Sequence, residues 1–198
     1  MTARLPLAHN AVMNKENIFV GQGIRLCAIE PKDAETMARW TEDATYLRDM
    51  DSSNAKPRSV ASYREELGSG SKRDALEFGI RATDGNKLIG FVNLFGVSWK
   101  NRSCLTVIGI GDPECRGKGH GTEAVRMILR YAFGELNMNR VGLSVYANNK
   151  AAIRCYEKNG FKCEGVEREA ALRDGRKIDS LYMGILHAEW AQSFPIEV

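Results

Sequence analysis

A glycine-rich segment near the middle of the chain has the residue types of an anion-binding loop. Its glycines alternate with Lys118 and His120, directly after a predicted strand and directly before a predicted amphipathic helix. Glycine lets the backbone turn its N–H groups toward one point, and a helix start adds unpaired N–H donors and a positive dipole end. The segment therefore predicts a pyrophosphate cradle, with full positive charge from its Arg and Lys. Its members are Arg116, Gly117, Lys118, Gly119, His120, Gly121 and Thr122.

Two other phosphate-binding loops share this strand–loop–helix context and differ in detail. The dinucleotide fingerprint requires a glycine where Thr122 stands, and an acidic residue near the end of the next strand, where Tyr146 and Ala147 stand. The triphosphate loop places Ser or Thr directly after its Gly-Lys pair, whereas Gly119 follows Lys118. Neither interpretation fits. A turn that needs its glycines for geometry alone stays open as the simpler alternative.

A second segment, residues 149–161, contains a predicted helix from about Asn149 to Lys158, closed by Asn159-Gly160. The residues spaced to share one face of this helix are Asn149, Ala152, Ile153 and Tyr156. A phenol has a reference pKa of about 10, so Tyr156 would stay protonated and can donate a proton to a leaving group. Its alternative role is that of a buried aromatic anchor. The charged side chains expected to fall away from this face are Lys150, Arg154 and Glu157.

Together the two segments resemble the GNAT acetyltransferase superfamily. The first contains Arg116-x-x-Gly119-x-Gly121, which resembles the acyl-CoA pyrophosphate motif. The second contains Asn149-x-x-Ala152-Ile153-x-x-Tyr156-Glu157-Lys158-x-Gly160-Phe161, which resembles a later signature of the same superfamily. The whole segment from Ile24 to Leu186 is similar to the branch of ribosomal-protein-alanine N-acetyltransferases. The resemblance implies an N-acetyltransferase that uses acetyl-CoA as co-substrate and an amine, small molecule or protein N-terminus, as acceptor.

The resemblance also implies a fold and a set of roles. The fold is α/β, with a central mixed and mostly antiparallel sheet that is splayed between its two middle strands and flanked by helices. The strand ending at Ile110 would carry a bulge and part from the strand Arg140–Tyr146, and pantetheine would enter the gap beside exposed backbone. The backbone N–H of Ile110 would face the thioester oxygen. The implied pantetheine contacts and catalytic groups are Ile108, Gly109, Ile110, Asn149, Ala152 and Tyr156.

One departure from that branch concerns the general base. Relatives often carry a glutamate in an Ala-Glu-Leu-Gly stretch, whereas Leu105 stands in the matching stretch here and cannot accept a proton. Glu77 and Glu114 are the carboxylates left near the expected site, with solvated surface acids as the alternative. At pH 7 an α-amine needs about 1.4 kcal/mol to become neutral and a lysine amine about 4.6 kcal/mol. Without a base, an α-amine or another low-pKa amine is favoured.

The elements that position these residues alternate between strands and helices. We expect strands over 24–29, 76–81, 87–95, 103–110 and 140–146, and a hairpin over 161–186. We expect helices starting at Pro31, Ser59, near His120 and near Asn149, the third with a buried stripe of Val125, Ile128, Leu129, Ala132 and Phe133. The expected organisation is an arm over residues 1–20, an acetyltransferase domain over 21–190 and a tail over 191–198.

Composition narrows the function classes. The chain has 198 residues and a net charge of +3, without a Lys/Arg run, so nucleic acid is not an expected partner. Its five cysteines lack the close spacing of zinc or redox motifs, so we expect free thiols and no metal. No signal peptide or membrane span is recognisable, which predicts a cytoplasmic protein. A small-amine acetyltransferase (polyamine, amino acid or aminoglycoside), a non-catalytic CoA-binding module and a homodimer all stay open.

Overall fold

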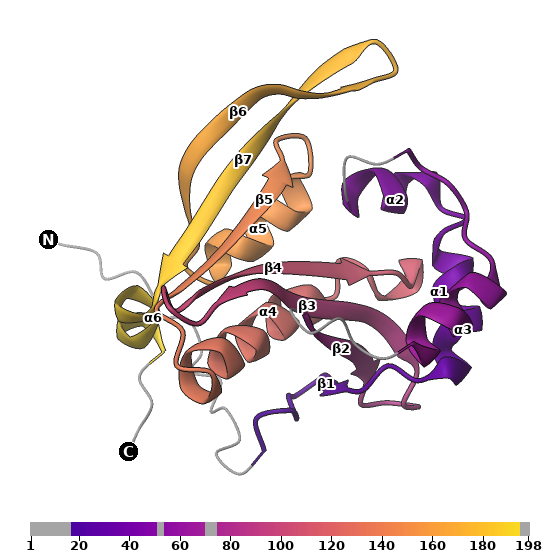
Figure 1. Cartoon of the computed structure of the whole chain (residues 1–198), viewed down its shortest axis with the longest axis horizontal. Helices are drawn as coiled ribbons and strands as arrows, with labels where there is room; N and C mark the ends of the chain where they lie inside the picture. The colour runs from indigo at the N-terminus through magenta and orange to yellow at the C-terminus, as the bar shows by residue number, and fades with distance from the viewer. Residues whose placement is uncertain (1–16, 51–53, 70–74, 195–198) are drawn as a thin grey trace, which may run out of the picture.

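A computed structural model of the chain describes residues 17–50, 54–69 and 75–194. Seven strands form one sheet in the order β1-β2-β3-β4-β5-β7-β6 (Figure 1). Every neighbouring pair is antiparallel except β4 and β5, which are parallel. The strands are β1 (Ile24–Cys27), β2 (Ala75–Ala82), β3 (Leu88–Ser98), β4 (Ser103–Ile110), β5 (Arg140–Tyr146), β6 (Lys162–Arg173) and β7 (Arg176–Leu186).

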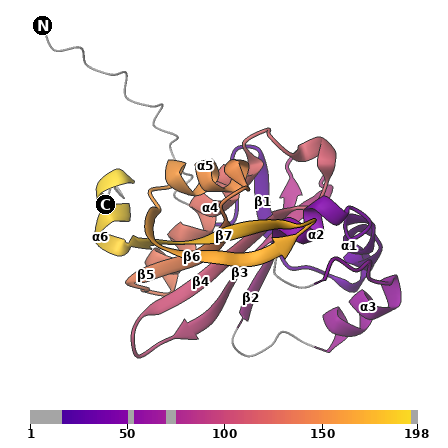
Figure 2. The ribbon, with the colours of Figure 1, turned by 90° about the horizontal axis from the view of Figure 1, so that it is seen from above.

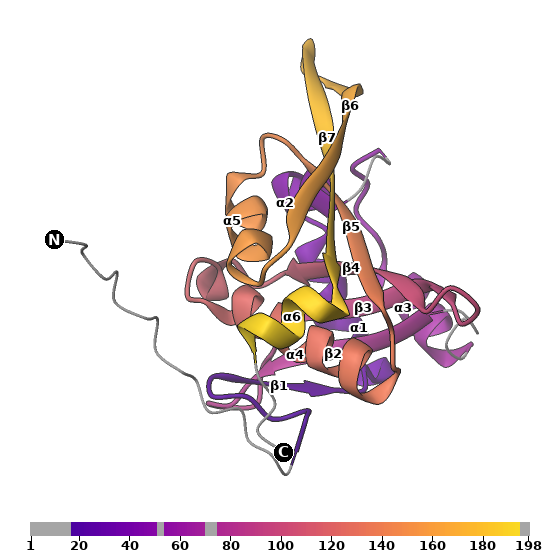
Figure 3. The same cartoon turned by 90° about the vertical axis from the view of Figure 1, so that its left-hand side faces the viewer.

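Helices lie on both sides of the sheet and at one end of it. Figure 2 shows α4 and α5 on one side, and α1, α2 and α3 gathered near the end of β4. The β6–β7 hairpin projects beyond the other strands (Figure 3). The helices are η1 (Pro31–Asp33), α1 (Ala34–Trp40), α2 (Ala44–Met50), α3 (Val60–Gly68), η2 (Pro113–Cys115), α4 (His120–Arg130), η3 (Tyr131–Glu135), α5 (Lys150–Lys158) and α6 (His187–Ser193).

The predicted opening between the two middle strands is present. β4 and β5 pair only through Ser103, Cys104 and Leu105, and beyond Leu105 each strand continues without the other. β4 stays registered on β3 as far as Ile110, and β5 stays registered on β7 as far as Tyr146. The strands diverge because each follows its outer neighbour. This geometry confirms the predicted α/β fold with a mixed, mostly antiparallel and splayed sheet.

The predicted bulge in the strand ending at Ile110 is wrong. The register between β3 and β4 runs without a shift from Leu105 to Ile110, and the irregularity lies in β3 between Phe95 and Ser98. No extra residue is needed in β4, because the divergence comes from the separate registers of the two halves of the sheet. The extra residue instead falls close to the β3–β4 turn.

Most predicted elements are present, and two helices were missed. The predicted stripe is buried, as expected from its periodicity, and it runs from α4 into η3, where Ala132 and Phe133 lie. The missed α2 is one short helix with a single buried residue, Tyr46, so it has no apolar stripe to recognise. The sequence feature that could have predicted α2 is Asp43. Its carboxylate accepts hydrogen bonds from the amides of Thr45 and Tyr46, as an N-cap does. The missed α6 buries Trp190 and runs to Ser193, into the predicted tail.

The chain ends are described only in part. Residues 1–16 of the predicted arm and 195–198 of the predicted tail lie outside the described residues, as do residues 51–53 and 70–74. Phe19 packs against Phe78 and Tyr131, with ring centroids 5.8 Å away in both cases. The backbone N–H of Leu26 donates to the carbonyl of Phe19. Phe19, within the last residues of the expected arm, is therefore packed on the domain and does not belong to a separate arm.

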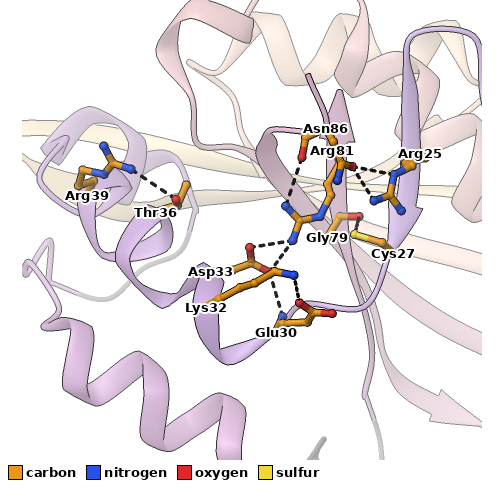
Figure 4. A network of polar contacts seen from close by, with 10 residues as sticks. All are labelled: Arg25, Cys27, Glu30, Lys32, Asp33, Thr36, Arg39, Gly79, Arg81 and Asn86. Carbon is orange, nitrogen blue, oxygen red and sulfur yellow. Dashed lines mark hydrogen bonds and ion pairs between the residues drawn. The ribbon is translucent and has the colours of Figure 1, made fainter. Parts of the chain in front are cut away.

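A buried ion pair fixes the first helices to the sheet. Figure 4 shows Asp33 of η1 facing Arg81 of β2, whose Nη2 donates to both carboxylate oxygens at 2.7 and 2.8 Å. Both residues are buried. The second oxygen of Asp33 also accepts from the Glu30 amide at 2.9 Å. Since α1 begins directly after Asp33, this pair sets where α1 and α2 lie over the end of β4.

We predict that Asp33→Ala lowers the free energy of unfolding by about 3–5 kcal/mol, because it leaves the Arg81 guanidinium buried without its partner. Urea unfolding followed by circular dichroism measures the change. Glu30→Gln, at an exposed carboxylate beside the pair, is the matched control and should change stability by less than about 1 kcal/mol. An Asp33→Ala protein as stable as this control would contradict the role assigned to the pair.

Candidate active site

A cleft of about 820 Å³ occupies the opening between β4 and β5. Its volume lies in the range of sites that hold a small ligand. The residues predicted to bind acetyl-CoA line this cleft, with the exception of Lys118 and His120. Lys118 is exposed, and the ring of His120 lies against Gly23 on the far side of the helix start. The two sequence segments therefore meet in one cleft, although the side chains of Lys118 and His120 do not line it.

The register of the strands divides the cleft into two arms. Phe95 pairs with Leu105, and Leu105 contacts the position where Gly142 would carry a Cβ, so these residues share one face. The helices α4 and α5 cover the opposite face. We call the α4–α5 side the back arm, lined by Gly119, Gly121, Asn149, Arg154, Tyr156 and Lys158. We call the other side the front arm, lined by Tyr46, Asp49, Phe95, Leu105, Glu167 and Tyr182.

The back arm presents a row of unpaired amides. Within the described residues, the backbone N–H groups of residues 117–122 make no hydrogen bond, and the first helical bond runs from Glu123 to Gly119 at 3.0 Å. Gly119 is the N-cap of α4 at φ 90°, without a side-chain cap. A left-handed backbone is costly for residues other than glycine. The sequence thus forms a helix start whose donors stay free for an anion.

Arg116 differs from its predicted role. Its amide donates to the Pro113 carbonyl, so it is not one of the free donors. Its guanidinium donates to the carbonyls of Ile110 and Gly111, both at 2.9 Å, and to the Asp43 carboxylate at 2.8 Å. The hydrogen bond from Arg116 holds the pKa of Asp43 below its ordinary value. The charge of Arg116 is therefore paired, and its side chain fixes the end of β4 to the α1–α2 turn.

Two other cations lie at the back arm. Arg154, expected to point away from the ligand face, lines the cleft, and so does Lys158 one turn later on α5. The expectation for Arg154 was wrong because a long side chain can reach around the helix that carries it. Gly121 of α4 lies next to Cys155 of α5, so these cations flank the free amides. Their positive charge adds to the attraction for a phosphate group.

Two buried phenols face the cleft. Tyr156 is 5% exposed and Tyr46 is 8% exposed, and neither hydroxyl hydrogen-bonds to another residue in the described part of the chain. Burial raises the pKa of both phenols above the ordinary value. Both therefore stay neutral and retain a proton to donate. The hydroxyl of Tyr46 lies where Gly109 would carry a Cβ, which explains glycine at that position.

Asn149 has a structural use beside its predicted one. Its Oδ1 accepts from the Ala152 amide at 3.0 Å, so it is the N-cap of α5 and not its first residue. The side-chain amide of Asn149 still has two N–H donors for a ligand. Ala152 and Tyr156 follow on the cleft-facing side of the helix, as expected.

The carboxylates in the cleft are not those that the sequence indicated. Glu77 and Glu114 do not line it, whereas Asp49 and Glu167 do. Glu167 accepts a hydrogen bond from the hydroxyl of Tyr182 at 2.6 Å. Asp49 was missed because α2 was missed, and Glu167 lies on a hairpin strand where several charged residues follow one another. The sequence does not show which of these charged residues faces the cleft, because that depends on the register of β6 on β7.

Among the described residues, no group of three or more His, Cys, Asp or Glu side chains is arranged to hold a metal ion. No helix in the described ranges combines the length and the apolar character needed to cross a bilayer. All five cysteines are free thiols, as expected.

Comparison with known proteins gives several matches. Residues 24–162 match the family model described as acetyltransferase (GNAT) domain. The SPbeta prophage-derived uncharacterized N-acetyltransferase YokL of Bacillus subtilis (strain 168) is 31% identical over 172 residues, covering 87% of this chain and 94% of the relative. The putative ribosomal N-acetyltransferase YdaF of the same strain is 31% identical over 176 residues, covering 86% and 95%. The crystal structure of spermidine N-acetyltransferase from Vibrio cholerae in complex with CoA and spermine has a TM-score of 0.75 at 26% identity, covering 85% and 98%.

These matches agree with the two motifs and with the cleft that holds them. The family model spans most of the chain, and both relatives are similar over nearly their whole length. Their names as N-acetyltransferases count against the alternative of a non-catalytic CoA-binding module. The chain belongs to the GNAT acetyltransferase family and is an N-acetyltransferase.

Proposed function

We propose that the protein transfers the acetyl group of acetyl-CoA to a primary amine by direct attack in a ternary complex. The observation that carries the proposal is one cleft that contains both a row of free amides, residues 117–122, and a buried, unpartnered phenol, Tyr156. The amides suit the pyrophosphate, with Arg154 and Lys158 beside them. The unpaired edges of β4 and β5 suit pantetheine, which would hydrogen-bond to them as an added strand does.

The backbone of Ile110 is suited to stabilise the developing negative charge. Its carbonyl oxygen is held by Nε of Arg116, and the N–H and C=O of one residue in an extended strand point to the same side. Its amide would therefore face the opening. Such a preorganised donor acts where charge grows on the thioester oxygen. Arg116 would then be a positioning residue for this amide.

The bonds and protons of the transfer balance without a covalent enzyme intermediate. A neutral amine forms the new N–C bond, the C–S bond breaks, and the amine nitrogen loses a proton. The thiolate gains a proton from Tyr156, which is neutral because burial raises its pKa. The phenolate regains a proton from the product nitrogen or from water. Catalysis then rests on position and electrostatics.

The class of amine that serves as acceptor can be identified by a screen. Relatives include a putative ribosomal N-acetyltransferase and spermidine N-acetyltransferases. An α-amine is easier to neutralise at pH 7 than a lysine amine by about 3 kcal/mol, which favours low-pKa amines where no strong base is present. Release of free thiol from acetyl-CoA, measured against peptides with different first residues and against small amines, tests the proposal. Release with no amine at all would contradict it.

We predict that Gly119→Ala weakens acetyl-CoA binding. Gly119 has φ 90°, and a left-handed backbone costs other residues about 1–2 kcal/mol. If the loop relaxes to avoid this strain, its amides no longer converge, and the Kd should rise about tenfold, equivalent to 1.4 kcal/mol. Isothermal titration calorimetry measures the Kd. Gly134→Ala, at an exposed glycine without positive φ and with open space around it, is the control; equal Kd values for both variants would refute the cradle.

We predict that Tyr156→Phe lowers kcat by about a hundredfold, the usual contribution of a positioned acid. The Kd of acetyl-CoA should stay within about twofold, because the ring and its packing on Phe161 are kept. In the wild-type protein, the raised pKa of Tyr156 means that no loss of kcat up to about pH 10 should come from this phenol. Tyr131→Phe, a phenol outside the cleft, is the control; a Tyr156→Phe enzyme that turns over like this control would remove the assigned role.

A further inference from the structure

The front arm combines carboxylates with apolar side chains. Asp49 on α2 and Glu167 on β6 bring the acidic groups of the cleft, and both lie at its exposed mouth. Burial raises the pKa of Asp49 by more than the nearby Arg173 and Arg116 lower it. A cation brought beside this carboxylate would therefore be stabilised. Of the cations that line the cleft, Arg154 and Lys158 belong to the back arm and Arg116 is already paired with Asp43. Arg173 lies near Asp49 but does not line the cleft, and its guanidinium lies over the Tyr146 ring.

The floor of the front arm is apolar and open. Phe95 is 38% exposed, Leu105 is 44% exposed and Tyr182 is 47% exposed, and all three line the cleft. Large apolar side chains that gather at an open site are typical of a surface that contacts a ligand. Leu105 is the last β4 residue that pairs with β5, so the apolar floor begins where the sheet opens.

A buried phenol supplies an independent observation that points to a ligand. Tyr46 is more than nine-tenths buried, lines the cleft, and has no hydrogen-bond partner for its hydroxyl among the described residues. Its oxygen lies over Gly109, the residue before Ile110. The hydroxyl oxygen is not itself sealed off from the cleft, so it is available to hydrogen-bond a bound group. The position next to Ile110 is where a reacting amine would lie.

We infer that the front arm binds a primary amine on an aliphatic chain whose far end carries a second positive charge. Tyr46 would hydrogen-bond the reacting amine, Phe95 and Leu105 would contact the chain, and Asp49 and Glu167 would bind the distal ammonium group. Tyr182 would hold Glu167 in place through its 2.6 Å hydrogen bond. The same carboxylates would repel an acceptor that ends in a carboxylate. The inference rests on the proposed transfer and adds the class of acceptor.

Three probes of matched length test the inference: 1,5-diaminopentane, pentylamine and 6-aminohexanoate. They differ mainly in the charge at the end away from the reacting amine. The expected order of kcat/KM is diamine, then monoamine, then amino acid, with at least about a tenfold gap between the first and the last. Equal values for the three probes, or the reverse order, would overturn the inference.

Variants then locate the effect. The double variant Asp49→Asn/Glu167→Gln should bring the diamine-to-monoamine ratio of kcat/KM close to one, with the loss mainly in KM. The double variant Glu42→Gln/Glu169→Gln removes the same charge outside the cleft and should leave the ratio as in the wild type. A ratio that falls equally in both proteins would reflect general charge and would overturn the assignment to Asp49 and Glu167.

A binding measurement separates this inference from the proposed transfer. If no amine releases thiol, the proposed function fails, and calorimetric titration of 1,5-diaminopentane into the protein with CoA still decides the inference. Binding that is lost in Asp49→Asn/Glu167→Gln supports it. Absence of diamine binding to the wild-type protein, or binding that the double variant retains, overturns it.

Discussion

The structure depends on the point at which β4 and β5 stop pairing. Beyond Leu105, β4 follows β3 and β5 follows β7, so the middle of the sheet presents two backbone edges without partners. Unpaired backbone groups away from water are costly, and an exposed edge is a place where another extended chain can pair. The opening therefore makes a ligand site out of the sheet itself, and the helices serve to close its two sides.

The two arms of the cleft share one support. Asp33 and Arg81 fix the start of α1, and the turn after α1 carries Asp43 to Arg116. The guanidinium of Arg116 then holds the carbonyls at the end of β4, from which the amide loop of the back arm continues. The same short α2 places Tyr46 and Asp49 in the front arm. A shift of the α1–α2 turn would thus alter the binding of both substrates.

The sequence predicted those parts of the site that depend on local rules. The glycine loop, the stripe of α4 and the spacing on α5 each follow from backbone geometry or helical periodicity. The pairing of Arg116 with Asp43 spans distant segments and has no local signal. Asp49 escaped because its helix is too short to show a period, and Arg154 because face assignments consider Cβ directions and not the reach of a long side chain.

Leu105, in the place of an expected acid, adds apolar surface to the front arm. An amine next to an apolar side chain is partly desolvated, and desolvation favours its neutral form. A carboxylate in the same place would favour the ammonium form, although it could also accept the proton. With the acids at the mouth and the apolar floor beside the opening, charge would be recognised at one end of the acceptor and suppressed at the other.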